Sequence, residues 1–287
     1  MPPIDSFTVG SIECQVLPDG FAMYSPGDLA PGVPDQQIIS ALKTPVDENG
    51  QMAVPYNCLL IRAGDRIALV DTGLGAEAAL QFGAPAGRLM ESLTASGIAA
   101  DQVDIVVISH AHPDHIGGLT AESDTGRVPV FSRARHYFWQ AEWDFWTDAD
   151  GLAQVPDMAD AARMHLPPVQ HAGLVELVSA ETDVLPGVRL LPAPGHTPGH
   201  IALAITSGSE GAIYLGDAVL DEANYEHPDW VSVVDAIPHL TIATRRYLIE
   251  KAIRENRLLV AFHMTARGYA RRANGTYRLR RAGVGAM

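Results

Sequence analysis

Cysteine is scarce in this chain of 287 residues, which contains only Cys14 and Cys58. Neither belongs to a C-x-x-C pair, so the sequence gives no sign of a thiolate zinc site or a dithiol redox motif. The count would allow one disulfide, but we expect a reduced pair, as is usual in an intracellular protein.

Long apolar runs are also missing. No window approaches the roughly 18 apolar residues of a membrane-spanning helix. The first ten residues, MPPIDSFTVG, lack a basic segment followed by an apolar one, so we expect no signal peptide. The sequence therefore predicts a cytoplasmic protein that does not enter a membrane.

Positive charge is in deficit, with 20 Lys and Arg against 34 Asp and Glu, a formal net charge of −14. This balance argues against nucleic acid or an anionic membrane as a partner and favours a small neutral or weakly charged substrate. The hydrophobic content of 47% allows a sizeable core. Composition shows no break, so we expect a single domain over residues 1–287.

Histidine, by contrast, is concentrated in one stretch. His110, His112 and His115 lie with Asp114 within six residues, directly after an apolar β-branched run. Neither the period of a strand nor that of a helix places all four on one face, whereas a tight loop leaving a strand end does. Imidazole and carboxylate together are typical ligands of zinc and its first-row neighbours.

His110 lies just beyond the end of an apolar run that is predicted to be a strand. Four other residues have the same placement: Asp71, His196, Asp217 and His263. Ligands gather where strand ends converge in open α/β folds. The set suffices for two metals about 3.5–4 Å apart with one shared aspartate. A G-x-S-x-G motif and a recognisable triad are absent, so the nucleophile is predicted to be a metal-bound water.

In these residues and their order along the chain, the sequence resembles the metallo-β-lactamase-fold hydrolases. The resemblance implies an α/β fold, an αββα sandwich of two central mixed β-sheets flanked by helices. It implies two divalent ions, Zn²⁺ first, with Fe, Mn or Co as alternatives, and catalytic roles for Asp114 and Asp217. It assigns His110, His112 and His196 to one ion, Asp114, His115 and His263 to the other, Asp217 as the bridge and Asp71 as support behind a ligand. His200 is no ligand in this family and is expected to be structural.

Within this family the chain looks like the branch of methyl parathion hydrolases and acyl-homoserine lactonases. That likeness implies a hydroxide bridging two metals that cleaves a lactone or carboxylic ester, an acyl-homoserine lactone among the possible substrates. The lactonases carry a tyrosine three residues after the bridging aspartate, where this chain has Leu220, and Tyr225 is the nearest substitute. The alternatives are a phosphotriesterase, a thioesterase similar to glyoxalase II and, less favoured, a mononuclear iron dioxygenase.

Two regions are expected to set specificity, a Pro- and Gly-rich loop over residues 21–55 and the segment 132–170. A turn is predicted at Pro18-Asp19-Gly20, and a single aromatic helix is predicted over His136–Trp146. The aromatic residues of that helix spread around its circumference and cannot all face one core. We therefore expect some of them to line a pocket or a homodimer interface. The predicted pocket residues are Phe138, Trp139, Trp143, Leu220 and Tyr225.

Overall fold

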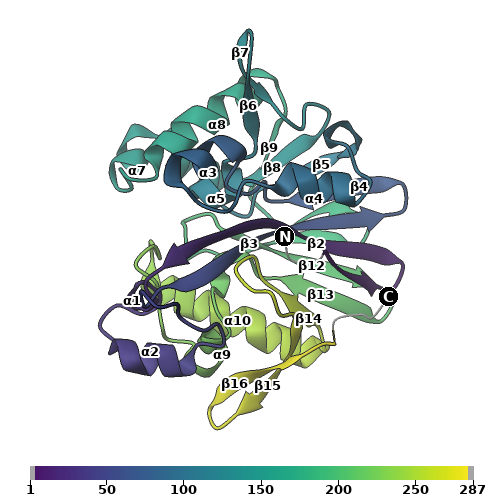
Figure 1. Cartoon of the computed structure of the whole chain (residues 1–287). Helices are drawn as coiled ribbons and strands as arrows, with labels where there is room; N and C mark the ends of the chain where they lie inside the picture. Colours follow the sequence, from purple (N-terminus) through teal and green to yellow (C-terminus); the bar gives the residue numbers. More distant parts are fainter. Residues whose placement is uncertain (1–3, 284–287) are drawn as a thin grey trace.

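Two seven-stranded mixed sheets form the centre of the computed structural model, which describes residues 4–283, the side chain of Phe82 aside. Figure 1 shows α3, α4, α5 and α8 above the sheets and α9 and α10 below them. Buried apolar residues of both sheets, Leu60 and Val106 in one and Leu190 and Leu203 in the other, belong to one core cluster. The sandwich of two mixed sheets between helices, predicted from the sequence, is confirmed.

The first sheet has the order β1-β2-β3-β4-β5-β8-β9. Its first four strands pair antiparallel, and the pairs from β4 onward are parallel. The carboxyl ends of β4 and β5 therefore lie at the same edge. The strands are β1 (Asp5–Val9), β2 (Ile12–Tyr24), β3 (Met52–Ala63), β4 (Arg66–Val70), β5 (Ile105–Val107), β8 (Arg135–Trp139) and β9 (Val175–Val178).

The second sheet has the order β10-β11-β12-β13-β14-β15-β16. All its pairs are antiparallel except β13 with β14, so β11, β13 and β14 end at one edge. Its strands are β10 (Thr182–Leu185), β11 (Val188–Pro192), β12 (Ile201–Ser207), β13 (Glu210–Tyr214), β14 (Leu258–Val260), β15 (Gly268–Ala273) and β16 (Thr276–Arg281). A separate hairpin joins β6 (Thr120–Ser123) to β7 (Gly126–Pro129).

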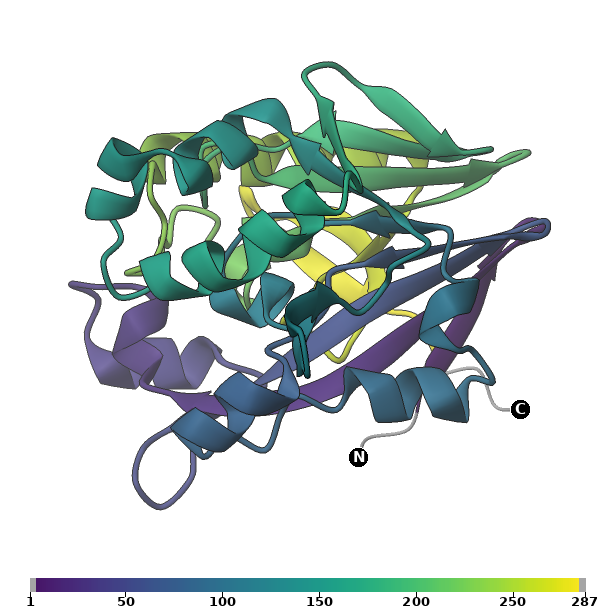
Figure 2. The same ribbon diagram turned by 90° about the horizontal axis from the view of Figure 1, so that it is seen from above.

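Helices cover the outer faces, as Figure 2 shows from above. α4 packs on β2, and α10 packs on β13 and β15. Short 3₁₀ turns cover Ala100–Gln102 and Gly216–Ala218. The helices are α1 (Pro26–Leu29), α2 (Asp35–Ala41), α3 (Ala76–Phe82), α4 (Leu89–Ala95), α5 (Pro113–Ile116), α6 (Gln140–Thr147), α7 (Ala149–Ala153), α8 (Ala159–His171), α9 (Ala223–Glu226) and α10 (Pro238–Glu255).

The turn predicted at Pro18-Asp19-Gly20 is wrong. β2 runs through these residues, and its pairing with β3 shifts register between Pro18 and Gly20. Proline has no backbone N–H to donate, and Gly20 adopts a φ of +133°, so the same residues that favour a turn make a bulge inside a strand. The predicted loop over 21–55 shortens accordingly to residues 25–51, which carry α1 and α2.

The single helix predicted over His136–Trp146 is also wrong. The segment divides at Gln140 into β8, which holds Phe138 and Trp139, and α6, which holds Trp143. Strand and helix present their side chains with different periods, and both bury apolar residues in the same core cluster. The aromatic argument for a dimer interface loses its basis here, and the homodimer itself stays a prediction.

The two cysteines are free and buried on neighbouring strands. In the register of β2 and β3, Cys14 lies opposite Ile61 and Cys58 lies opposite Leu17, so the thiols are not cross-strand partners. Among residues 4–283, no helix is both long enough and apolar enough to cross a lipid bilayer.

Candidate metal centre

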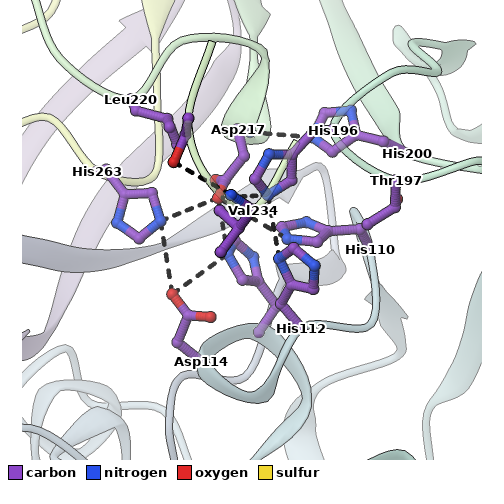
Figure 3. A network of polar contacts seen from close by, with 12 residues as sticks. His110, His112, Asp114, His196, Thr197, His200, Asp217, Leu220, Val234 and His263 are labelled. Carbon is purple, nitrogen blue, oxygen red and sulfur yellow. Dashed lines mark hydrogen bonds and ion pairs between the residues drawn. The ribbon is translucent and has the colours of Figure 1, made fainter. Parts of the chain in front are cut away.

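The His and Asp candidates converge at the edge where strands of both sheets end (Figure 3). His110 follows β5, His196 follows β11, and Asp217 and His263 follow the parallel pair β13 and β14. Pro113 is the first residue of α5, and this single turn places Asp114 and His115 beside the strand ends. Loops from two sheets thus meet at one cluster, as the placement of these residues after apolar runs predicts.

Three overlapping groups of side chains have ligand atoms within 4.8 Å of one another. They are His110 with His112 and His196, His110 with His115 and Asp217, and Asp114 with His115 and His263. His196 Nε2 lies 3.0 Å from His112 Nδ1, close to the spacing of about 3.3 Å between nitrogens that share one tetrahedral ion at about 2.0 Å.

Asp217 occupies the middle of the cluster. Burial opposes its ionisation, but His263, His115 and His110 hold the pKa of its carboxyl well below the ordinary value. The carboxylate is therefore charged and faces both sides of the site. Its Oδ2 lies 2.9 Å from His263 Nε2, 3.3 Å from His196 Nε2, 3.5 Å from His115 Nε2 and 3.8 Å from His110 Nε2.

Unpartnered buried atoms show that the cluster fits metal ions. His110 Nε2, His115 Nε2 and Asp217 Oδ1 have no hydrogen-bond partner among the described residues. Buried polar atoms are rarely left unsatisfied without a functional reason. Imidazole nitrogen and carboxylate oxygen are two of the atom types that bind zinc. The residues present therefore fit divalent cations, and Asp217 and the imidazoles of the overlapping groups would hold them.

Burial lowers the pKa of His110 and His112 well below the ordinary value, and neighbouring imidazoles lower it further. Both rings are thus neutral, which is the form that binds a metal. Burial acts in the same direction on His115, but the carboxylates of Asp217, Asp114 and Asp71 raise its pKa well above the ordinary value. A cation bound beside His115 would take the place of that proton.

Asp71 fixes the segment that follows β5 through contacts with Ser109 and His115. Its carboxylate accepts hydrogen bonds from Ser109 N at 2.7 Å, Ser109 Oγ at 2.8 Å and the Tyr214 hydroxyl at 2.9 Å, and it lies 3.0 Å from His115 Nδ1. Asp71 also adopts a φ of +64°, which is costly for a non-glycine residue and persists only where several contacts fix it. These contacts direct His115 Nε2 toward the cluster.

The other ring nitrogens are fixed in the same manner. His196 Nδ1 donates to Asp235 Oδ1 at 2.9 Å, and His263 Nδ1 donates to the Pro55 carbonyl at 3.0 Å. His200 differs, because its Nδ1 donates to the Ala193 carbonyl and its Nε2 accepts the Asp217 N–H at 2.9 Å. With both nitrogens used, His200 positions the Asp217 backbone, which agrees with the structural role expected for it.

We expect Asp235→Asn to weaken metal binding about 10- to 100-fold, the usual effect of losing a carboxylate that orients a ligand imidazole. The amide keeps the shape but gives His196 no negatively charged acceptor. Zinc affinity measured by competition with a chromogenic chelator tests this. Asp229→Asn is the control. Asp229 lies in the same loop, between α9 and α10, and is an exposed ion-pair partner of Arg246. Equal zinc affinity of Asp235→Asn and the control would contradict the role given to Asp235.

Glu142 ties the two ligand loops together. Its fully buried carboxylate accepts hydrogen bonds from Ala111 N and Trp146 Nε1 on one oxygen and from Thr197 Oγ1 and Gly199 N on the other, all between 2.6 and 2.9 Å. Burial raises the pKa of this carboxyl, whereas the four donors act against that rise. Ala111 lies between two ligand histidines, and Thr197 follows a third.

The cluster forms the floor of a cavity of about 530 Å³. Among the described residues that line it, none is Lys or Arg. Its four charged side chains besides histidine are all aspartates, and most of the rest of the wall is apolar. The lining comes from β2 and β3 (Ala22, Met23, Tyr24, Met52, Ala53, Val54, Pro55, Tyr56), from the 25–51 segment (Asp28, Leu29, Thr44), from Leu74 and 83–85, and from Met158, Leu220, Asp221, Ser232 and Val234.

Leu220 is the one predicted pocket residue that lines this cavity. Phe138 and Trp143 are buried in the main core, and Trp139 packs against it. Tyr225 is buried in the cluster between the second sheet and α10, so it does not take the place of the lactonase tyrosine. The pocket prediction is corrected for these four residues, because their apolar surface is used in packing.

Two other tyrosines line the cavity instead. The hydroxyls of Tyr24 and Tyr56 lie 2.7 Å apart. Burial, and next the charge of Asp114, raise the pKa of both above the usual range, so both hydroxyls keep their protons at neutral pH. Neither residue was found from the sequence. Their only signal is their position on two strands that flank the Pro-rich segment.

Three buried carboxylates were also missed. Besides Glu142 and Asp235, Asp19 turns inward at the bulge in β2 and accepts the N–H groups of Leu74, Gly87 and Leu89. Each carboxylate holds a loop that borders the cluster. An acidic residue inside an apolar or aromatic stretch, as Glu142 is, was the available signal.

This arrangement of strands and ligands is that of the metallo-β-lactamase superfamily, whose family model matches residues 52–263. The chain belongs to this superfamily and is a metal-dependent hydrolase.

Among relatives, the N-acyl homoserine lactonase AiiA of Bacillus thuringiensis subsp. kurstaki is 26% identical over 226 residues, which cover 73% of this chain and 81% of that protein. Two solved structures share the fold. The hydrolase AbOPH of the β-lactamase superfamily has a TM-score of 0.85 at 24% identity, with 97% of each chain covered. The dizinc quorum-quenching lactonase AidC has a TM-score of 0.82 at 22% identity, with 99% of this chain and 98% of that one covered.

Proposed function

We propose that this hydrolase cleaves the ester bond of a small neutral molecule, with lactones, acyl-homoserine lactones among them, as the first substrate class. The observation that carries the proposal is the cavity, which has largely apolar walls, no cationic side chain among its described lining residues and the metal-ligand cluster at its floor. An acyl chain fits the apolar wall, and the ester group then lies at the cluster. The relatives named as lactonases support the same class.

The residues that would hold the ions are those of the overlapping groups, His110, His112, Asp114, His115, His196, Asp217 and His263. Two ions of this kind, which we propose to be zinc, would supply Lewis acidity and lower the pKa of water enough for it to act as a nucleophile near neutral pH.

The chain itself supplies orientation and exclusion of water. Asp71, Asp235 and the Pro55 carbonyl fix the rings of three ligand histidines, so little rearrangement is needed when substrate binds. Asp114 is the more exposed carboxylate of the cluster, with 16% of its side chain accessible, and lines the cavity. Asp114 is therefore the side chain placed to accept the proton that the attacking water releases once it has added to the substrate.

The cavity lining weakens two alternatives. A glutathione thioester carries two carboxylates, and the described wall offers no cation to pair with either of them. A nucleic-acid substrate is disfavoured by the same lack of basic side chains. A phosphotriester is neutral and suits the cavity as an ester does, so it is the rival that needs an experiment.

A substrate panel run on protein of known metal content tests the proposal. We expect turnover of N-hexanoyl-homoserine lactone and γ-decalactone with kcat/KM at least about 10-fold above that for the phosphotriester paraoxon and for S-lactoylglutathione, a difference worth about 1.4 kcal/mol in transition-state binding. Fastest turnover of paraoxon would replace the proposal by a phosphotriesterase. Oxygen consumption with one iron per chain would replace it by a dioxygenase.

A further inference from the structure

The Tyr24–Tyr56 pair has one hydroxyl proton that their mutual hydrogen bond does not use. Two hydroxyls 2.7 Å apart use one of their two protons in the bond between them, which leaves the other proton for a third acceptor. No protein acceptor for that proton is found among the described residues. Both tyrosines line the same cavity as the ligand cluster, so the cavity is the space open to the free donor.

The two tyrosines differ in burial and in their contact with the ligand cluster. Tyr56 is buried, with 2% of its surface exposed, whereas Tyr24 is 38% exposed. The ring of Tyr56 meets the His263 ring edge-on, with centroids 5.6 Å apart. The carbonyl of the preceding residue, Pro55, accepts the His263 Nδ1 proton. Either hydroxyl can donate in the bond between them. When Tyr24 donates, the Tyr56 proton is left for an acceptor on the side of the cavity that Asp114 and His263 also line.

Other donors on the wall are few. The Ser232 hydroxyl already donates to the Asp28 carbonyl, and the position that follows the bridging aspartate by three residues is the apolar Leu220. A carboxylate only accepts hydrogen bonds, so in that form the four aspartates of the lining offer no donor. Thr44 on the 25–51 segment is a further hydroxyl of the lining, but Tyr56 is the hydroxyl residue whose ring contacts a ring of the cluster, that of His263.

We propose that Tyr56, positioned by Tyr24, donates a hydrogen bond to the leaving oxygen of the ester or lactone. This inference rests on the proposed ester hydrolysis. Water adds to the acyl carbon, the acyl C–O bond breaks with its electrons passing to the leaving oxygen, and the proton that completes the alcohol comes from that water. Tyr56 keeps its own proton and stabilises the negative charge as it develops.

The dependence on the leaving group tests this role. In Tyr56→Phe we expect kcat/KM to fall about 100-fold for γ-decalactone, whose alkoxide is a poor leaving group, in line with the loss of one donor to a developing oxyanion. For 4-nitrophenyl decanoate, whose leaving oxygen carries little charge, we expect a loss under about 5-fold on the same argument. Tyr24→Phe should show the same trend with a smaller amplitude. Tyr225 is buried outside this cavity, so Tyr225→Phe should leave kcat/KM unchanged for both substrates.

A binding measurement gives a second readout. Wild-type protein should bind 4-hydroxydecanoate, the product of γ-decalactone, more tightly than decanoate in calorimetry, and Tyr56→Phe should bind the two alike. An equal loss for both substrates with the product preference intact would overturn the proposal and leave Tyr56 as a structural residue. Failure of wild-type protein to hydrolyse any ester or lactone would instead overturn the proposed function, so the two failures are distinguishable.

Discussion

Asp217→Asn is expected to abolish turnover, with a loss on the order of 10³-fold or more, because removing a shared ligand costs several kcal/mol and each 1.4 kcal/mol is tenfold in rate. The amide keeps the size of the carboxylate but not its charge. The Asp217 Oδ2 atom lies within 3.8 Å of four imidazole nitrogens, and no other aspartate of residues 4–283 reaches all four. We therefore expect metal content to fall from two ions per chain to fewer than one.

Elemental analysis after dialysis and kcat/KM for γ-decalactone measure this effect. Asp221→Asn is the matched control, since Asp221 lines the same cavity but its Oδ1 accepts the Ala223 N–H, a bond that an amide oxygen retains. The control should keep both ions. If Asp217→Asn kept two ions and wild-type turnover, Asp217 would not be the bridge.

Glu142→Ala is expected to lower the free energy of unfolding by about 4–5 kcal/mol. The substitution leaves four buried donors without an acceptor, and each unsatisfied group costs about 1–3 kcal/mol before the structure relaxes. At about 2–4 °C per kcal/mol for a chain of this size, Tm should fall by about 10–15 °C. Glu142→Gln, which retains one accepting oxygen, should fall between Glu142→Ala and the wild type.

Thermal unfolding of the metal-loaded protein measures the loss. Asp144→Ala removes an exposed carboxylate from the same helix and should stay within about 0.5 kcal/mol of the wild type. The two ligand loops are joined through Glu142, so Glu142→Ala should also bind zinc more weakly. If the Tm of Glu142→Ala lay within 2 °C of the Asp144→Ala value, the difference in unfolding free energy would be roughly 1 kcal/mol or less. That result would show that other contacts hold the loops.

The ligand cluster could be predicted because its signals are local. Each of its ligand segments follows an apolar run that the sequence identifies as a strand, and parallel strands bring their ends to one edge. The buried carboxylates that orient the cluster could not be found in this way. Glu142 and Thr197 are 55 residues apart and meet only in the folded chain.

The cavity was predicted less well than its floor. Aromatic residues near His136 were expected to line it, but alternation on β8 and the face of α6 carry them into the core. Tyr24 and Tyr56 line it instead, because the bulge at Pro18–Gly20 lets β2 continue beside β3 as far as Tyr24. Bulge and turn use the same residue types, so only the pairing partner distinguishes them.

Metal titration of the metal-free protein tests the central claim most directly. Zinc is added in steps to protein stripped with a chelator, and the rate of γ-decalactone hydrolysis is followed against zinc equivalents. We expect negligible activity without metal and a rise that reaches its plateau at two equivalents per chain. Full activity of the stripped protein, or a plateau at one equivalent, would contradict a dinuclear hydrolase.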